Sequence, residues 1–230
     1  MSAYDPFAVD YDRWSQEMTE DVPFYVELAR EADGPVVELA VGNGRVAIPV
    51  ARETGRPVLG IDLSSVMLSQ ARERADEAGV ALELREGDMR ELELDEPAAL
   101  IYCPFRGMMH LPTWADRRRT FERLAAALKP GGRFAWNVFV FSPHRAARID
   151  GQWQDDAPVP HRVDQVPADS RIDLTLESGA KISLWWSTRA EWEGLLDVAG
   201  LEVEALYGWF DRRPFDEQSE EMVWVARRPE

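Results

Sequence analysis

The sequence predicts an α/β fold with a doubly wound, mostly parallel sheet, and three observations support this prediction. Short apolar runs of strand length alternate with segments of helical period over residues 35–141, as in parallel sheets covered by helices on both faces. The 230 residues are 45% apolar and 30% charged, which is ordinary for a globular domain. No internal repeat, low-complexity tract or linker-like stretch divides the chain. We therefore expect a single domain over residues 1–230.

Strands of the sheet are expected wherever an apolar run of strand length is bounded by turn residues. The first part of the chain contains five such runs, at residues 35–41, 57–62, 81–85, 98–103 and 133–141. The first helix between them is expected at residues 45–53.

Two further helices carry recognisable end signals. Ser64 is a suitable N-cap for a helix whose apolar residues recur at helical spacing, and Gly79 stands where a C′ glycine belongs. A second helix begins after Thr113, with Asp116 three residues later as in a capping box. Residues 129–132, Lys-Pro-Gly-Gly, end it.

The pattern changes after the fifth strand. Residues 142–167 mix Pro, Asp, Arg and His without a clear period, whereas residues 172–177 and 181–186 read as strands around Ser178-Gly179, a hairpin signal. We interpret residues 143–187 as an inserted cover, or lid, with a small antiparallel sheet.

The end of the chain supplies one helix and two more strands. Thr188 and Glu191 form a capping box, and Gly200 closes the helix. Strands at residues 201–209 and 222–227 bring the sheet to seven, the last being antiparallel.

Composition excludes several classes of function. The chain has 26 basic and 42 acidic residues, a net charge of −16, and such a field repels a nucleic-acid backbone. The single cysteine, Cys103, forms no internal disulfide. The first residues are acidic where a secretory signal is basic and then apolar, and no apolar run reaches the roughly 18 residues of a membrane span. We expect a cytoplasmic protein without a nucleic-acid or membrane partner; nothing in the sequence predicts its oligomeric state.

The strongest chemical signal is the turn between the first strand and the first helix. Gly42 and Gly44 lack side chains where the backbone bends and a ligand can approach it closely. Asp62 ends the second strand, where a carboxylate can accept hydrogen bonds from ribose hydroxyls. Asp88 ends the third strand at the same edge and can accept from an adenine amino group. A nucleotide-like ligand is therefore predicted.

The turn alone leaves alternatives open. Residues 42–47, Gly-Asn-Gly-Arg-Val-Ala, also satisfy the dinucleotide-binding pattern, so an NAD(P)-dependent oxidoreductase has to be considered. No Tyr-x-x-x-Lys pair accompanies it. A tight turn without any ligand is the third interpretation.

Four motifs in the same order resemble those of the class I S-adenosylmethionine-dependent methyltransferases. They are Glu-Leu-Ala-Val-Gly-Asn-Gly at 38–44, Gly-Ile-Asp-Leu-Ser-Ser-Val-Met-Leu at 60–68, Glu-Gly-Asp-Met-Arg at 86–90 and Leu-Lys-Pro-Gly-Gly-Arg-Phe at 128–134. The resemblance covers about residues 35–142 and implies a Rossmann-like fold with S-adenosyl-L-methionine as cofactor and S-adenosyl-L-homocysteine as product. Arg45 departs from the family pattern, which has a third glycine there, and so does Pro-Ala-Ala at 97–99.

The resemblance also implies which residues contact the cofactor. The backbone around Ala40, Gly42 and Gly44 is expected under the methionine part, Asp62 at the ribose, and Met67, Asp88 and Met89 at the adenine. By the same resemblance the expected set includes Tyr11, Glu38, Leu63 and Cys103. A sulfonium compound without phosphate suits this turn, which offers acids and no lysine.

The substrate side is expected to be formed by aromatic segments that flank the sheet edge. Tyr4, Phe7, Tyr11 and Trp14 precede the first strand, so residues 1–34 are taken as an N-terminal helical lid segment, beside a cofactor-binding core at 35–142 and a C-terminal helix and hairpin at 188–230. Trp185 and Trp186 neighbour each other on one predicted strand and so face opposite sides.

Three residues are candidates for the transfer reaction itself. His110, after the fourth strand, is a candidate general base, although a structural histidine is the competing interpretation. Arg106 and Trp186 are candidates for acceptor binding. The three histidines lack metal-ligand spacing, so no metal is expected. The sequence as a whole predicts methyl transfer, by in-line displacement, to an oxygen or nitrogen of a small molecule; a cofactor-binding module without catalysis is the alternative from another class.

Overall fold

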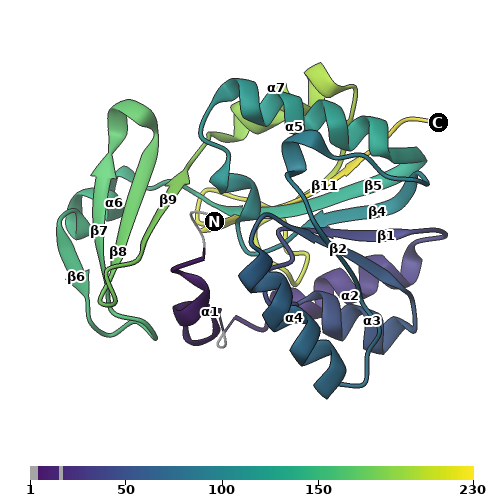
Figure 1. The fold of residues 1–230 in the computed structure, drawn as a ribbon. Helices are drawn as coiled ribbons and strands as arrows, with labels where there is room; N and C mark the ends of the chain where they lie inside the picture. Colours follow the sequence, from purple (N-terminus) through teal and green to yellow (C-terminus); the bar gives the residue numbers. More distant parts are fainter. Residues whose placement is uncertain (1–4, 16–17) are drawn as a thin grey trace.

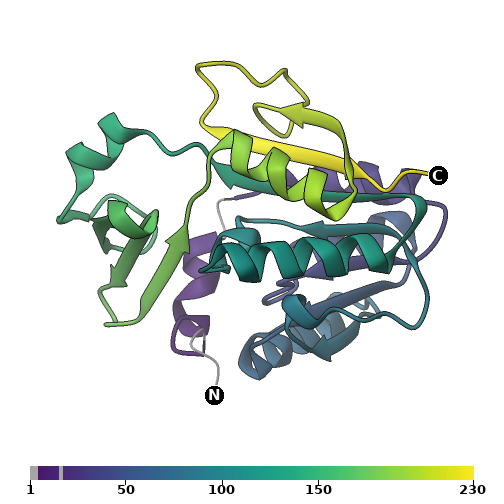
Figure 2. The same cartoon turned by 90° about the horizontal axis from the view of Figure 1, so that it is seen from above.

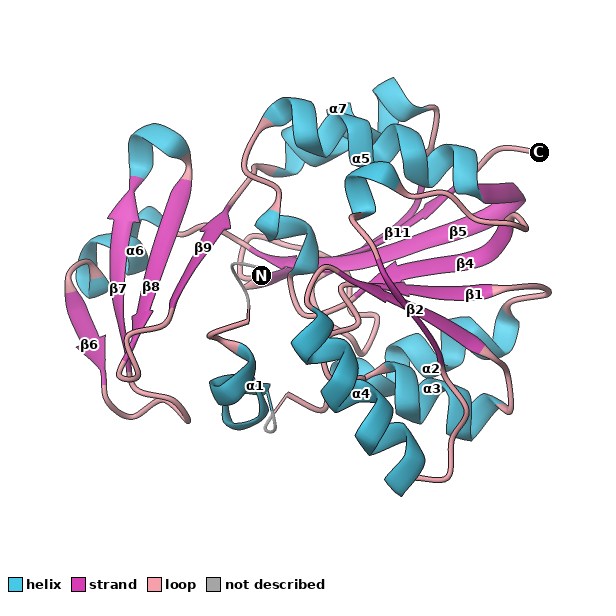
Figure 3. Ribbon diagram, in the orientation of Figure 1, coloured by secondary structure: helices cyan, strands magenta, loops and turns pink. Residues whose placement is uncertain are grey.

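The computed structural model describes residues 5–15 and 18–230, so Tyr4 lies outside the described residues. Within that part of the chain, two sheets are present: a seven-stranded sheet in the body of the molecule and a four-stranded sheet set apart from it (Figures 1 and 3).

The large sheet has the order β10-β11-β5-β4-β1-β2-β3. Strand β11 runs antiparallel to both of its neighbours, β5 and β10, and the remaining neighbours pair in parallel. The predicted mostly parallel sheet with an antiparallel last strand is thus confirmed. The strands are β1 (Val36–Leu39), β2 (Val58–Asp62), β3 (Glu83–Glu86), β4 (Ala98–Cys103), β5 (Leu128–Phe139), β10 (Glu202–Tyr207) and β11 (Glu221–Arg227).

Helices cover both faces of this sheet (Figure 1). One face packs against α5 (Trp114–Ala127) and α7 (Arg189–Ala199), through side chains such as Phe121 and Trp192 that surround Trp136 of β5. The other face packs against α2 (Asp21–Glu31), α3 (Ala47–Thr54) and α4 (Ser65–Glu77). Burial on two faces explains why the central strands read as continuous apolar runs.

The predicted helix caps are present. The Ser64 side chain accepts a hydrogen bond from the backbone N–H of Met67 at the start of α4. Thr188 and Glu191 form a reciprocal capping box at α7. Helix α3 begins at Ala47, two residues later than predicted, because Gly44 still belongs to the turn and donates its N–H to the carbonyl of Val41.

One predicted turn belongs to a strand. Residues 129–132 follow α5 directly and are the first residues of β5. Gly131 donates its N–H to the carbonyl of Arg228, and Arg228 donates its N–H to the carbonyl of Gly132. The carboxyl-terminal end of the chain therefore supplies partners that the local sequence does not reveal.

The inserted segment is more regular than predicted. Residues 142–167, expected to be irregular, contain α6 (Pro143–Ile149), β6 (Gln152–Gln154) and β7 (His161–Val166). These strands and the predicted pair, β8 (Arg171–Leu176) and β9 (Lys181–Trp185), form the antiparallel sheet β6-β7-β8-β9. We call residues 143–187 the lid. Strand β9 ends at Trp185, so Trp186 lies just beyond it.

Helix α1 (Ala8–Ser15) lies between the lid and the body of the molecule (Figures 1 and 2). A separate apolar cluster joins Phe7 and Ala8 to Met67 of α4 and to lid residues such as Val163 and Leu174. None of the helices formed by residues 5–15 and 18–230 combines the length and apolar character needed to cross a bilayer.

Candidate active site

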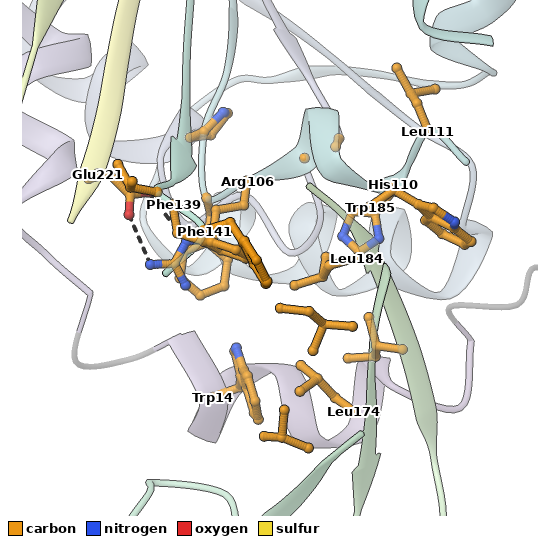
Figure 4. A pocket seen from close by; sticks show the side chains of 18 of the residues that line it. Trp14, Arg106, His110, Leu111, Phe139, Phe141, Leu174, Leu184, Trp185 and Glu221 are labelled. Carbon is orange, nitrogen blue, oxygen red and sulfur yellow. Dashed lines mark hydrogen bonds and ion pairs between the residues drawn. The ribbon is translucent and has the colours of Figure 1, made fainter. Parts of the chain in front are cut away.

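A cavity of about 1190 Å³ opens between the lid, α1 and the carboxyl edge of the parallel strands. This is the edge at which open α/β sheets bind ligands. One end of the cavity is lined by the glycine turn and the residues that follow β2 and β3, and the other end by aromatic and aliphatic side chains of the lid, α1 and β5 (Figure 4).

The glycine turn has the strained backbone that the sequence predicts. Ala40 has a φ of 51°, which is rare for a residue with a side chain, and Gly42 and Gly44 have φ values of 54° and 81°. A Cβ on Gly42 would lie 3.5 Å from the Tyr11 ring, an ordinary contact, so the positive φ rather than a lack of space favours glycine there. A Cβ on Gly44 would lie 3.0 Å from the end of the Ile48 side chain, so Gly44 allows α3 to pack closely. Ala40 and Gly42 line the cavity and Gly44 does not.

Asp62 joins the glycine turn to the start of α4. The backbone N–H of Gly42 donates to Oδ2 over 2.9 Å, and that of Ser64 donates to Oδ1 over 2.8 Å. Burial raises the pKa of Asp62, and these backbone hydrogen bonds partly offset that rise. A carboxylate has about four acceptor positions, so both oxygens of Asp62 can still accept from a ligand. The side chain lines the cavity, as a ribose-binding residue must.

Glu38 lies beneath the turn and does not line the cavity. Its side chain is 1% exposed, and its Oε2 has no hydrogen-bond partner within the described chain. Burial raises the pKa of Glu38 to about 8, although the Tyr102 hydroxyl and the Arg45 guanidinium oppose the rise. Glu38 is therefore mostly protonated near neutral pH and acts within the protein, beneath the turn, where a ligand in the cavity does not reach it.

Asp88 lines the cavity but already has strong partners. Arg90 donates to it from its backbone N–H over 2.9 Å and from Nη2 over 2.6 Å, and it also pairs with Asp116. Burial would raise the pKa of Asp88, but these hydrogen bonds outweigh burial and hold that pKa below its usual value. Asp88 is thus an ionised acceptor held in position by Arg90.

Of the other residues that the family resemblance implied, some line the cavity and some do not. Tyr11, Leu63, Met67 and Met89 line it. Cys103 is fully buried, and a Cβ on Gly107 would lie 2.5 Å from its Sγ, so the thiol packs beneath the loop after β4. Burial raises the pKa of this thiol well above its ordinary value, which keeps it protonated.

Arg45, which departs from the family pattern, points away from the turn toward α2. Its Nη1 and Nη2 donate to the two carboxylate oxygens of Asp21 over 2.7 and 2.6 Å, and Asp21 is completely buried. The guanidinium also lies 5.0 Å from the centre of the Phe105 ring. The one cation in the turn is therefore neutralised by Asp21 and does not provide a phosphate-binding clamp.

His110 lies at the end of a short 3-10 helix, η2 (Gly107–His110), and lines the cavity. Burial lowers the pKa of His110 to about 4, and a backbone hydrogen bond with Ser183 of the lid offsets only part of that decrease. The imidazole is therefore neutral at physiological pH, and the burial that keeps it neutral also makes it a weaker base than an ordinary histidine.

Arg106 forms a bidentate ion pair with a residue from the far end of the chain. Its Nη2 donates to Oε2 of Glu221 over 3.0 Å and its Nε donates to Oε1 over 3.3 Å (Figure 4). Glu221 is 2% exposed and also accepts from Asn137 over 2.6 Å, and Asn137 in turn accepts from the Tyr25 hydroxyl. Sequence analysis did not identify Glu221, because it is 115 positions from Arg106 and no local pattern connects them.

The opposite end of the cavity is mostly apolar. Trp14, Phe139, Phe141, Leu174, Leu184 and Trp185 surround it (Figure 4). Trp186, predicted to contact the acceptor, does not line it; its ring stacks on Phe141 with the ring centres 3.9 Å apart. Trp185 occupies the lining position instead. The alternation of a strand indicated two opposite faces, but the sequence did not tell which one faced the cavity.

These features fit an adenosyl sulfonium cofactor better than a dinucleotide. The turn provides backbone at Ala40 and Gly42 and a carboxylate at Asp62, and its only cation is neutralised by Asp21. A pyrophosphate would require a positive or donor-rich clamp, whereas a sulfonium with an amino group is attracted by acids and aromatic rings. No group of three or more His, Cys, Asp or Glu side chains in residues 5–15 and 18–230 is arranged to hold a metal ion.

Comparison with known proteins agrees with this geometry. The profile of a family described as "Methyltransferase domain" matches residues 36–132. A putative methyltransferase of Bacillus subtilis, YqeM, is 31% identical over 142 residues, which is 60% of this chain and 51% of the relative. The chain thus spans about half the length of the curated relatives it matches.

Solved structures resemble the whole chain. The CcbJ methyltransferase of Streptomyces caelestis has a TM-score of 0.83 and 25% identity, and the match covers 100% of this chain and 99% of that one. The SAM-bound amino pentose methyltransferase CalS10 of Micromonospora echinaspora has a TM-score of 0.68 and 21% identity over 96% of both chains. With the four motifs at the sheet edge and the cofactor-compatible turn, these matches support a class I S-adenosylmethionine-dependent methyltransferase, whose methyltransferase domain is matched at residues 36–132.

Proposed function

We propose that the protein transfers a methyl group to a nitrogen or oxygen atom of a small-molecule acceptor that binds between the lid and the large sheet. The observation that carries this proposal is the two-part cavity: a turn suited to the cofactor at one end and an apolar, aromatic wall with one neutral histidine at the other. When bound, S-adenosylmethionine supplies a methyl group on a positively charged sulfur.

The cofactor is held, in this proposal, by residues that line the turn end of the cavity. Asp62 accepts from the ribose hydroxyls, and Asp88 and Met89 face the adenine. The remaining contacts come from Tyr11, Ala40, Gly42, Leu63 and Met67. Glu38, Gly44 and Cys103 act from beneath the turn, where they shape it without lining the cavity.

The chain contributes to the reaction by positioning the acceptor, excluding water and accepting a proton. Trp14, Phe141 and Trp185 exclude water from the acceptor end, which favours a reaction in which charge is lost. His110 is neutral and accepts the proton of an acceptor that arrives protonated. Arg106, held by Glu221, offers its remaining N–H groups to a polar group of the acceptor.

The small-molecule acceptor class has further support. The cavity volume is of the size that ligand-binding pockets have, and most of its acceptor end is apolar. CalS10, with the same fold, is an amino pentose methyltransferase, which supports this class by analogy.

The test of the proposed function has two steps. Thermal unfolding is measured with S-adenosylhomocysteine, NAD and NADP; a ligand at 100 times its dissociation constant adds about 2.7 kcal/mol to the free energy of unfolding. We expect this gain with S-adenosylhomocysteine alone. The protein is then incubated with methyl-labelled cofactor and a library of small amines, phenols and alcohols. Cofactor binding without label transfer to any member would contradict the proposed activity.

The role of His110 is tested with an acceptor found in this way. His110→Ala is expected to lower kcat by about 10²-fold or more, as loss of a general base does. His144→Ala, an exposed histidine at the same cavity, is the control. Turnover of the His110 variant close to the wild-type rate would eliminate the proton-acceptor role.

A further inference from the structure

Helix α6 brings three basic residues to the rim of the cavity. His144, Arg145 and Arg148 all line it, and all three are exposed to solvent. Arg145 and Arg148 are three positions apart on one helix, so their side chains share a face. Helix α6 begins two residues after Phe141, and Phe141 is one of the apolar side chains that line the acceptor end of the cavity.

These two arginines differ from the other arginines of the cavity in their partners. Arg90 is paired with Asp88 and Asp116, and Arg106 with Glu221. In the part of the chain that the structure describes, neither Arg145 nor Arg148 takes part in an ion pair, although Glu217 and Glu220 also line the cavity. The two guanidiniums are therefore positive groups at the cavity rim whose N–H donors can bind an anionic ligand.

We propose that Arg145 and Arg148 bind an anionic group of the acceptor, a carboxylate or a phosphate, at the rim of the cavity. This rests on the proposed function and names the acceptor class: a molecule with an apolar body, a nucleophilic nitrogen or oxygen and an anionic end. Guanidinium groups match both anions with paired N–H donors.

The apolar side chains and the arginines at the rim of the cavity would bind different parts of such an acceptor. In this proposal Phe141, Leu184 and Trp185 contact its body, and the reacting atom lies beside His110, which is half-buried whereas the two arginines are exposed. The anionic end remains at the rim, so the charge stays partly hydrated and its desolvation cost is small. An ion pair between these arginines and the anionic group would then favour anionic over neutral acceptors without burying a charge.

A kinetic experiment with matched acceptors tests this assignment. Each amine or phenol acceptor is offered to the wild-type protein in four forms: carboxylate, primary amide, phosphate monoester and free alcohol. We expect one of the anionic forms to be preferred over its neutral counterpart by about tenfold or more in kcat/KM, as charged hydrogen bonds imply. The form preferred distinguishes carboxylate from phosphate.

The double variant Arg145→Gln/Arg148→Gln is expected to lose that preference while its kcat/KM for the neutral forms stays within a factor of two or three. The control Arg52→Gln/Arg72→Gln removes the same charge from exposed positions away from the cavity. Equal kcat/KM for anionic and neutral forms in the wild type, or a preference that survives in the double variant, would overturn the proposal.

A second measurement does not require turnover, so its outcome is separate from the proposed activity. The protein saturated with S-adenosylhomocysteine is titrated calorimetrically with inorganic pyrophosphate and, separately, with benzoate. We expect one of the two probes to bind the wild type and the Arg52/Arg72 control alike, and the Arg145/Arg148 variant at least about tenfold more weakly. Affinity for S-adenosylhomocysteine should be the same in all three proteins. Failure of both probes to bind the wild type, or equal binding to the double variant, would refute the anion site.

Discussion

Asp62 illustrates how much of the site depends on single residues. One carboxylate accepts the N–H of Gly42 in the turn and the N–H of Ser64 at the N-cap of α4. The same residue lines the cavity. It therefore positions the turn and, in the proposed site, also accepts from the ribose, so a substitution affects both roles.

Asp62→Ala is expected to weaken S-adenosylhomocysteine binding by about 1–3 kcal/mol, because it removes a charged hydrogen-bond acceptor together with the two backbone hydrogen bonds that hold the turn. Isothermal calorimetry measures the change, and thermal unfolding without ligand shows whether the fold has been lost. Asp76→Ala, an exposed carboxylate on α4, is the matched control. Unchanged affinity in Asp62→Ala would refute the ribose assignment.

His110 predicts a pH dependence of stability. Burial lowers its pKa from an ordinary 6.5 to about 4, so below pH 6.5 the unfolded chain binds the proton more readily than the folded one. Stability linked to this group is therefore complete above pH 6.5 and decreases as the pH falls toward 4. In denaturant titrations, the stability of His110→Gln relative to wild type should improve by up to about 3 kcal/mol over that interval. A difference that does not vary between pH 7 and pH 4 would contradict this pKa.

At the scale of elements, the contacts that connect the lid to the body of the molecule include an aromatic stack and a buried arginine. Phe141, on the chain segment that enters the lid, stacks on Trp186, on the segment that leaves it. Beside them Arg117 of α5 is buried and donates to the carbonyls of Leu111 and Trp185 and to the hydroxyl of Ser187. We call these contacts the lid neck.

Trp186→Ala should loosen the lid neck and leave the cofactor site intact. The stack is worth about 0.5–1.5 kcal/mol beyond the area that it buries. We expect faster hydrogen exchange in β9 and a higher KM for the acceptor, with unchanged S-adenosylhomocysteine affinity. Trp153→Ala is the control, because Trp153 is 47% exposed on the lid. If both variants exchange alike, the stack does not hold the lid.

At the scale of the whole molecule, the buried apolar side chains form three clusters. Two of them fill the two faces of the large sheet. The third is built from parts distant in sequence: Phe7 and Ala8 at the start of the described chain, Met67 of α4, and lid residues such as Leu174. Because Phe7 and Met67 both line the cavity, a ligand there contacts this cluster directly.

Amide hydrogen exchange should therefore slow both in α1 and in the glycine turn when a ligand binds in the cavity. S-adenosylhomocysteine is expected to slow exchange at residues 8–15 and 40–44, because it adds contacts to both walls of the cavity. The strands β4 and β5, already buried, should change little and serve as the internal control. Slower exchange at the turn alone would show that α1 is not part of the cofactor site.

Local sequence patterns predicted the body of the fold well because local physical chemistry governs it. The cap at Ser64, the capping box at Thr188 and the apolar runs of β1 and β4 each depend on residues only a few positions apart. The lid strands β6 and β7 were missed for the opposite reason: they are mostly polar, and their regularity comes from pairing, β6 with β7 and β7 with β8. Whether a residue favours a strand depends more on its neighbours in the sheet than on an intrinsic preference of its own backbone.

The sequence by itself determined the order of the parallel units, the sharp glycine turn, the acid at the end of β2 and the four motifs that resemble the class I methyltransferases, because each of these is encoded within a short stretch of residues. Only the tertiary structure decided that Glu221 holds Arg106, that Trp185 rather than Trp186 faces the cavity, and that Arg145 and Arg148 have no carboxylate partner among residues 5–15 and 18–230. These facts depend on which distant side chains meet, and that is set by how the lid, α1 and the last strand pack against the sheet.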